Sequence, residues 1–131
     1  MAGETDLTVL LRTMQPVLLK GEYVFCSIDY QRTNWLELNP VGFFREEEGL
    51  TLILLRERAD NAALPYTSVF RMLTLSVHSS LSAVGFLAAI TGKLAEHGIS
   101  VNPVSAYYHD HLFVPASRSD EVMELLQEFS R

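Results

Sequence analysis

The stretch that decides the fold is residues 83–102, which read AVGFLAAITGKLAEHGISVN. Its apolar residues recur at intervals of three and four, as on the buried face of a helix: Ala83, Leu87, Ile90 and Leu94. Gly98 stands where such a helix would end. The spacing therefore predicts a helix over residues 83–97, followed at once by an extended segment.

Further elements surround this helix. Residues 70–77 (FRMLTLSV) predict a strand before it, and residues 99–108 and 111–116 predict two strands after it, joined by a tight turn at His109-Asp110. Ser119 is the expected N-cap of a last helix. The inner face of that helix carries four apolar residues: Val122, Leu125, Leu126 and Phe129. The order from residue 70 is β-α-β-β-α.

This order is one strand short of a ferredoxin-like βαββαβ unit. An unpaired sheet edge is a liability, so the missing fourth strand should come from the first half of the chain or from a second subunit. We expect an α+β protein with two intertwined ferredoxin-like units and antiparallel sheets. The expected units are residues 1–65, a degenerate copy, and residues 66–131.

The first half offers the elements of that degenerate copy. Residues 5–14 predict a helix that stops near Pro16, and residues 22–28 predict a strand with a buried face. Residues 41–45 and 50–55 predict a hairpin. One or two helical turns are expected over residues 56–64.

Composition excludes several classes of protein. The chain has 131 residues, of which 48% are hydrophobic and 20% charged, so one ordinary domain or two small ones are expected and disorder is not. The net charge of −6 argues against nucleic acid or an anionic membrane as a partner. Cys26 is the only cysteine, and we expect it in a strand and buried. A single cysteine and no apolar run of membrane length predict a soluble cytoplasmic protein.

Residues 83–102 resemble the signature of ACT domains, in particular the regulatory repeats at the C-terminus of aspartokinases. There a glycine opens the helix and a strand similar to Ile-Ser-Val-Asn follows it. The whole chain also resembles small bacterial stand-alone proteins with two ACT-like units, in which residues 21–25 and 107–115 recur. The chain departs from the family pattern at Val84, where many ACT domains have proline or another loop residue, and in its missing C-terminal strand. The resemblance implies paired units that bind small molecules, often amino acids.

The loop after residue 77 and the start of the next helix are the expected ligand site. A helix N-terminus presents free N–H groups and a positive dipole end, which suit a carboxylate. Asn102 offers a donor and acceptor for an α-amino or α-carboxyl group, although it could equally satisfy an edge strand. Ser82 could simply cap the helix and Gly85 could serve packing. The expected ligand-binding residues are Ser79, Ser80, Ser82, Val84, Gly85, Phe86, Asn102, His109 and Asp110.

A cluster of imidazoles provides an alternative. Strand topology could bring His78, His109 and His111 to one end of the sheet, where they would suit zinc, nickel or proton transfer. Against this, a two-residue turn points its side chains outward, and the histidines lack the i, i+4 helical spacing of familiar metal sites. A structural turn or the rim of a ligand pocket is favoured, with Tyr107 and Tyr108 packing on opposite sheet faces.

We therefore expect an ACT-type sensor that binds a small molecule, most simply an amino acid, and forms a homo-oligomer. No catalytic residue, metal or other cofactor is expected, and any regulated activity would lie on another chain. Two alternatives stay open. One is a small metal-dependent enzyme that uses His78, His109 and His111, and the other is a homodimerising interaction module without a ligand.

Overall fold

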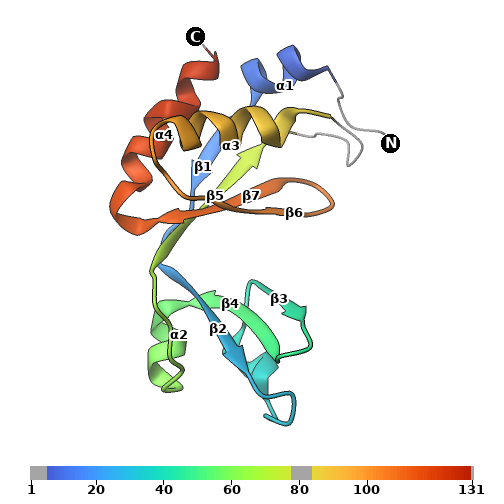
Figure 1. Ribbon diagram of the computed structural model, residues 1–131, viewed down its shortest axis with the longest axis vertical. Coiled ribbons are helices and arrows are strands. Elements are labelled where there is room, and N and C mark those ends of the chain that lie inside the picture. Colours follow the sequence, from blue (N-terminus) through green and yellow to red (C-terminus); the bar gives the residue numbers. More distant parts are fainter. Residues whose placement is uncertain (1–5, 78–83, 131) are drawn as a thin grey trace. The chain divides into compact units, whose positions relative to one another are not determined.

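The computed structural model describes residues 6–77 and 84–130. The chain forms two compact units (Figure 1). Unit 1 comprises the chain up to Lys20 and from Arg71 onward, and unit 2 comprises Gly21–Phe70. Packing therefore groups the first twenty residues with the C-terminal half, whereas the division expected from the sequence groups them with residues 21–65.

Unit 1 contains a mixed set of helices and strands. Its elements are α1 (Leu7–Thr13), β1 (Gln15–Leu18), β5 (Phe70–Ser76, of which Phe70 belongs to unit 2), α3 (Phe86–Glu96), β6 (Asn102–Ser105), β7 (Asp110–Pro115), the 3-10 helix η2 (Ala116–Arg118), α4 (Ser119–Gln127) and the 3-10 helix η3 (Glu128–Ser130). The strands are ordered β1-β5-β7-β6. From β5 to α4 the order is the expected β-α-β-β-α.

The missing fourth strand of unit 1 is β1. It runs antiparallel to β5, from Gln15 opposite Ser76 to Leu18 opposite Leu73. Of the two expected sources, the first half of the chain and a second subunit, it is the first half that supplies this strand. The sequence predicts only that the first helix stops near Pro16, yet a proline is tolerated in a strand at a sheet edge. The completed sheet has the strand order of a ferredoxin-like unit.

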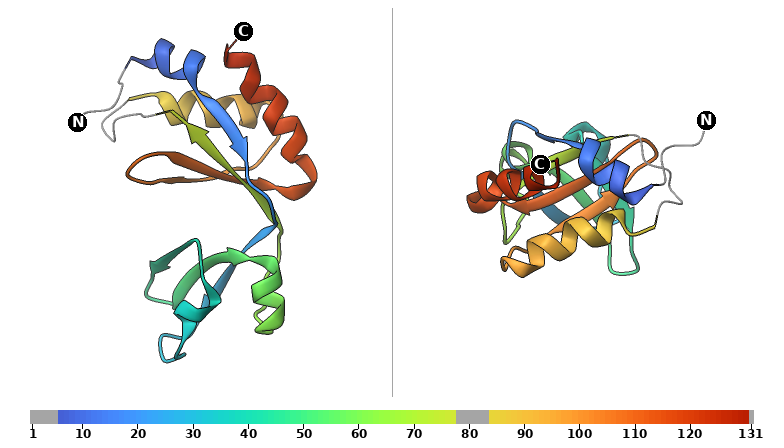
Figure 2. Two further views of the ribbon diagram at one scale, coloured as in Figure 1. Left: turned by 180° about the vertical axis from the view of Figure 1, so that it is seen from behind. Right: turned by 90° about the horizontal axis from the view of Figure 1, so that it is seen from above.

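The helices α1, α3 and α4 lie together on one side of this sheet (Figures 1 and 2). Apolar side chains of these helices point into a shared core with β5 and β7. Its most deeply buried members come from all of these elements: Leu10, Leu73, Leu75, Ile90, Leu94, Leu112, Val114, Val122 and Leu126. Asp6 caps α1, because its carboxylate accepts a hydrogen bond from the Val9 amide at 3.3 Å.

Unit 2 repeats the plan in a reduced form. Its elements are β2 (Tyr23–Ile28), the 3-10 helix η1 (Trp35–Leu38), β3 (Gly42–Arg45), β4 (Leu50–Leu55) and α2 (Arg56–Asn61). The sheet order is β3-β4-β2, and Phe70 pairs with Tyr23 on the other side of β2. Counting Phe70 as a last, minimal strand gives βαββαβ, with η1 in place of the first helix. Cys26 is buried in the core of this unit, as expected.

Three boundaries differ from the sequence predictions. The turn between β6 and β7 is residues 106–109, where the Ala106 amide donates to the His109 carbonyl at 3.0 Å, so the tight turn predicted at His109-Asp110 is wrong. Helix α3 begins at Phe86. Ser119 is the first residue of α4 rather than its N-cap, because the turn η2 precedes it, and its hydroxyl donates to the Ala116 carbonyl at 3.2 Å.

In the part of the chain that the structure describes, no helix is long and apolar enough to cross a bilayer.

Candidate ligand site

The start of α3 is shaped by Gly85. This residue is the N-cap of the helix and has φ 89° and ψ −11°, a left-handed conformation that favours glycine. Its carbonyl accepts from the Ala89 amide at 2.9 Å, and the following Phe86 anchors the helix in the core. Glycine has no side chain that could cap the first turn. The N–H groups of that turn therefore depend on other partners, and the neighbouring Val84 is exposed.

The β6–β7 turn lies at the same end of unit 1 as the start of α3 (Figures 1 and 2). Two hydrogen bonds join this hairpin to β5 and to Val77, the residue that follows β5. His109 Nδ1 lies 3.3 Å from the Val77 carbonyl oxygen, and His111 Nδ1 lies 2.9 Å from Thr74 Oγ1. From His109 to His111 the chain moves forward, whereas the contacted residue moves back from Val77 to Thr74, as expected for antiparallel neighbours.

Asp110 is the only acidic side chain in the described chain that is classed as buried, with 9% of its surface exposed. It begins β7 and pairs with Ser105 of β6. Alternate strand residues share a sheet face, so Asp110 lies on the same face as Leu112 and Val114, which belong to the core with α3. The carboxylate thus lies on the helix-covered face, at the end where α3 begins.

His111 lies on the opposite face of β7. Partial burial lowers its pKa from the ordinary value, the nearby His109 lowers it further, and Asp110 opposes both effects. The imidazole is therefore held in its neutral form near pH 7. Among residues 6–77 and 84–130 no group of three histidine, cysteine or acidic side chains is arranged to hold a metal ion. His78, which the proposed cluster needs, lies outside the described residues.

The remaining expected ligand residues fall in different places. Ser79, Ser80 and Ser82 also lie outside the residues that the structure describes. Asn102 is opposite Phe113 at the far end of β6, three positions from the pair next to the turn, a distance of about 10 Å along a strand. Within unit 1, Asn102 is therefore not brought to the end of the sheet that holds Gly85, Phe86, His109 and Asp110.

Tyr107 and Tyr108 occupy the turn itself. Their rings meet edge to face with centroids 5.0 Å apart, and their exposed fractions are 70% and 66%. The prediction that they pack on opposite faces of a strand is wrong. The four turn residues include no glycine, proline or asparagine, so local turn chemistry gave no reason to place the turn there.

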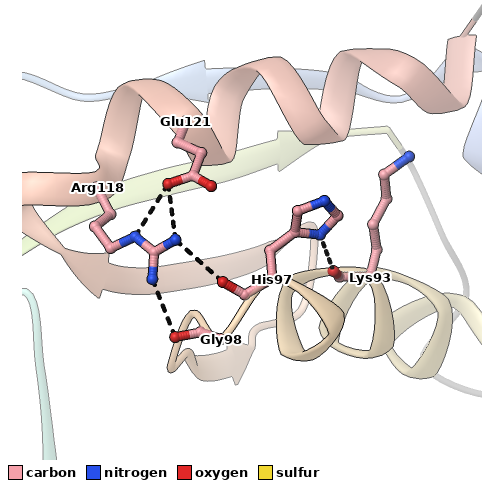
Figure 3. Close-up of polar contacts among 5 residues, drawn as sticks. All are labelled: Lys93, His97, Gly98, Arg118 and Glu121. Carbon is pink, nitrogen blue, oxygen red and sulfur yellow. Dashed lines mark hydrogen bonds and ion pairs between the residues drawn. The ribbon is translucent and has the colours of Figure 1, made fainter.

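The hydrogen bonds of Arg118 connect the end of α3 to α4 and do not form part of the expected ligand site (Figure 3). Its guanidinium donates to the carbonyl oxygens of His97 and Gly98 beyond the end of α3, both at 3.1 Å. It also donates twice to Glu121 Oε1, at 3.0 and 2.8 Å. Arg71 donates from Nη2 to the Leu19 carbonyl oxygen at 2.8 Å, which fixes the end of β1. None of these hydrogen bonds of Arg71 and Arg118 is made to the start of α3.

Unit 2 has a surface hollow that the sequence did not indicate. It has a volume of about 410 Å³ and lies beside α2, with Glu22, Arg56, Glu57 and Asp60 among its lining residues. The Arg56 guanidinium forms an ion pair with Glu22 at 3.1 Å, and its Nε donates a hydrogen bond to Tyr66 Oη at 2.9 Å. Among the described residues that line the hollow, Arg56 is the only cation, and its guanidinium is engaged in these pairs.

Comparisons with known proteins agree with the fold. The ACT domain family matches residues 2–71 and, a second time, residues 67–128. A solved structure of a protein of unknown function from Vibrio cholerae, described as a possible transport protein, is 45% identical. The match covers 97% of this chain and 98% of that chain, with a TM-score of 0.88. A comparison with curated protein sequences gave no match.

More distant structures share the fold alone. A protein from Agrobacterium tumefaciens is 17% identical, with a TM-score of 0.73 and 89% of each chain covered. The aspartokinase alpha and beta subunits are 12% identical, with a TM-score of 0.60 over 87% of this chain and 95% of that chain. ACT domains are ligand-binding regulatory modules. With two matching segments that together span nearly all of its length, the chain belongs to the ACT domain family.

Proposed function

We propose that this protein is a regulatory sensor that binds an amino acid at the start of α3 and acts on another chain. The observation that carries the proposal is the N-terminus of α3, where Gly85 opens the helix without a capping side chain. Two ACT units within one short chain support a regulatory role. We assign no catalytic step to the protein.

The chemistry of the site suits a carboxylate. The helix dipole places roughly half a positive charge at the N-terminus, which stabilises an anion by about 0.3–1 kcal/mol at an exposed position and up to about 2 kcal/mol where it is partly buried. Hydrogen bonds from the first-turn N–H groups add to this. Gly85 favours such binding, because it lacks a β-carbon that would crowd a ligand near the backbone.

A screen of the twenty common amino acids by thermal shift and calorimetry tests the proposal. A ligand at 100 times its dissociation constant should raise the free energy of unfolding by about 2.7 kcal/mol. Gly85→Ala should weaken this effect. Gly98→Ala is the matched control, because Gly98 also has a positive φ, at the other end of α3. Its added β-carbon meets no atom within 4 Å among the described residues, its two chain neighbours apart.

Both variants should lose stability, since each places an L-residue in a left-handed conformation, at a cost of about 1–2 kcal/mol. Only Gly85→Ala should also lose ligand stabilisation. The proposal is wrong if no amino acid stabilises the wild-type protein, and the location is wrong if both variants keep the full effect.

We also propose that the protein is cytoplasmic and forms a homo-oligomer. Self-association is supported by β3, the edge strand of the unit 2 sheet, where Phe43 is half exposed and Phe44 is 71% exposed. Exposed aromatic side chains beside an open strand edge favour pairing with another chain. Sedimentation velocity should show a dimer or larger species, and a monomer at all accessible concentrations would refute this second proposal.

A further inference from the structure

We infer that two copies of this chain pair through β3 of unit 2, edge to edge and antiparallel, with Phe44 of one copy opposite Phe44 of the other. The inference rests on the self-association proposed above and makes it more specific. It names the occupant of the open edge, the register of the two strands and the number of copies, which is two.

The first observation is that β3 has backbone groups available on its outer side. In the described part of the chain its one partner strand is β4. The Glu46 amide donates to the Gly49 carbonyl, and every second residue of an antiparallel pair bonds across to the partner strand. Phe44 is therefore bonded to β4, whereas the N–H and C=O groups of Phe43 and Arg45 point to the open edge.

The second observation is that both edge strands of unit 1 carry a proline at an outward-facing position. In β1 the Leu19 amide donates to the Met72 carbonyl at 2.9 Å, and the alternation of bonded residues directs Pro16 to the edge. In β6 the hydrogen bond within the turn 106–109 directs Pro103 to the edge in the same way. Proline has no N–H to donate to a further strand, and natural sheets use it to block edge pairing. Of these three edges, β3 is the one that a second copy can extend.

Side chains on both faces of β3 also favour cover by another chain. Phe44 is 71% exposed on one face. Phe43 is half exposed on the other face, where its ring meets Trp35 edge to face with centroids 4.9 Å apart. Val41, just before the strand, is exposed as well. A row of exposed apolar side chains along one open edge is typical of an interaction surface.

Charge and size select one register. A two-fold axis at Phe44 sets the two Phe44 rings against each other on one face. On the other face it sets each Phe43 against Arg45 of the second copy, a cation–π arrangement. An axis at Arg45 would instead place two cations opposite each other, and an axis at Phe43 would leave Phe44 opposite Gly42.

The acidic run of residues 46–48 favours the antiparallel direction. In the register centred on Phe44 this run lies beside residues 40–42 of the second copy, which are uncharged. A parallel pair would set the two acidic runs side by side, and like charges on adjacent strands repel each other. Because the two-fold axis uses the same strand of both copies, pairing occupies both open edges and stops at two copies.

Charge-swapped variants of Phe44 test this register in the full-length protein. The wild type should sediment as a dimer. Phe44→Glu and Phe44→Lys should each raise the dimer dissociation constant by about tenfold or more, because equal charges meet at the axis. An equimolar mixture of the two variants should recover dimers, since opposite charges then meet. Val104→Glu is the matched control, because Val104 is 39% exposed on the proline-blocked strand β6, and it should leave the constant unchanged.

A proline substitution tests the blocked edge. Pro103→Thr adds an N–H on the outer side of β6, so this variant should form species larger than a dimer at the same concentrations. Phe44 and Pro103 are both exposed, so we expect the folded state to tolerate these substitutions. Far-UV circular dichroism and urea unfolding check that each variant folds.

If both Phe44 variants form dimers as tightly as the wild type, or if their mixture stays as weak as each variant alone, pairing in this register is refuted and the proposed self-association stands. If Pro103→Thr remains a dimer, the blocking role of the prolines is refuted. If the wild type is a monomer at all accessible concentrations, self-association and pairing through β3 both fail. Amino-acid sensing is then still decided by the ligand screen.

Discussion

At the scale of single residues, His111 couples the candidate site to pH. Burial and His109 lower its pKa in the folded protein below the ordinary value of 6.5, so the unfolded chain binds more protons as the pH falls through that value. The stability from the neutral imidazole is present above about pH 6.5 and is lost at lower pH. We predict that the free energy of unfolding in urea falls between about pH 7.5 and pH 5.5, and falls less in His111→Gln.

The glutamine can keep a hydrogen bond to Thr74, so the variant removes the titration while preserving the polar contact. His97→Gln is the control, because His97 is exposed at the end of α3. It should keep the wild-type loss of stability on acidification. An unchanged pH dependence in His111→Gln would contradict the assignment to this residue.

At the scale of elements, Arg118 joins the end of α3 to the start of α4 (Figure 3). Its planar guanidinium reaches two carbonyl oxygens and Glu121 at once, and a lysine ammonium cannot reproduce that geometry. We predict that Arg118→Lys lowers the free energy of unfolding by about 1–2 kcal/mol, the value of one or two lost hydrogen bonds. Arg12→Lys, at an exposed position of α1, should change it by less than about 0.5 kcal/mol in the same urea titration. Equal effects of the two substitutions would show that the contacts of Arg118 contribute nothing to stability.

The elements that the sequence predicts correctly are those with local signals. Helix α4 follows from its apolar spacing, and the β3–β4 hairpin follows from two apolar runs around Gly49, whose carbonyl accepts from the Glu46 amide at 3.0 Å. The turn after β6 has no such local signal. The strand propensity of Tyr107 and Tyr108 instead predicts that the strand continues through both residues. The sequence therefore predicts that Asp110 is exposed in a turn, although its alternation with Leu112 indicates a strand. Its burial depends on how the helices cover the sheet, which no local pattern contains.

At the scale of the whole molecule, the chain enters unit 2 after Lys20 and returns to unit 1 after Phe70. Counting elements predicts that the C-terminal half lacks a strand, but it does not say which segment supplies it. The segment is β1, whose pairing with β5 joins residues far apart in the sequence. Unit 1 is thus a ferredoxin-like unit whose last strand comes from the beginning of the chain.

This arrangement makes unit 1 a natural candidate for circular permutation. Helix α1 contacts η3, so a short linker can join residue 130 to residue 6. We predict that a chain of residues 71–130, linker and 6–20 folds alone with a cooperative urea transition, whereas residues 71–130 without the addition do not. The shorter fragment loses the buried Leu10 and Met14, at about 2–5 kcal/mol each, and leaves β5 with an open edge. That loss is comparable to the whole stability of a small domain, about 5–15 kcal/mol. If both fragments unfold cooperatively at the same urea concentration, β1 is dispensable and the C-terminal half folds as a unit by itself.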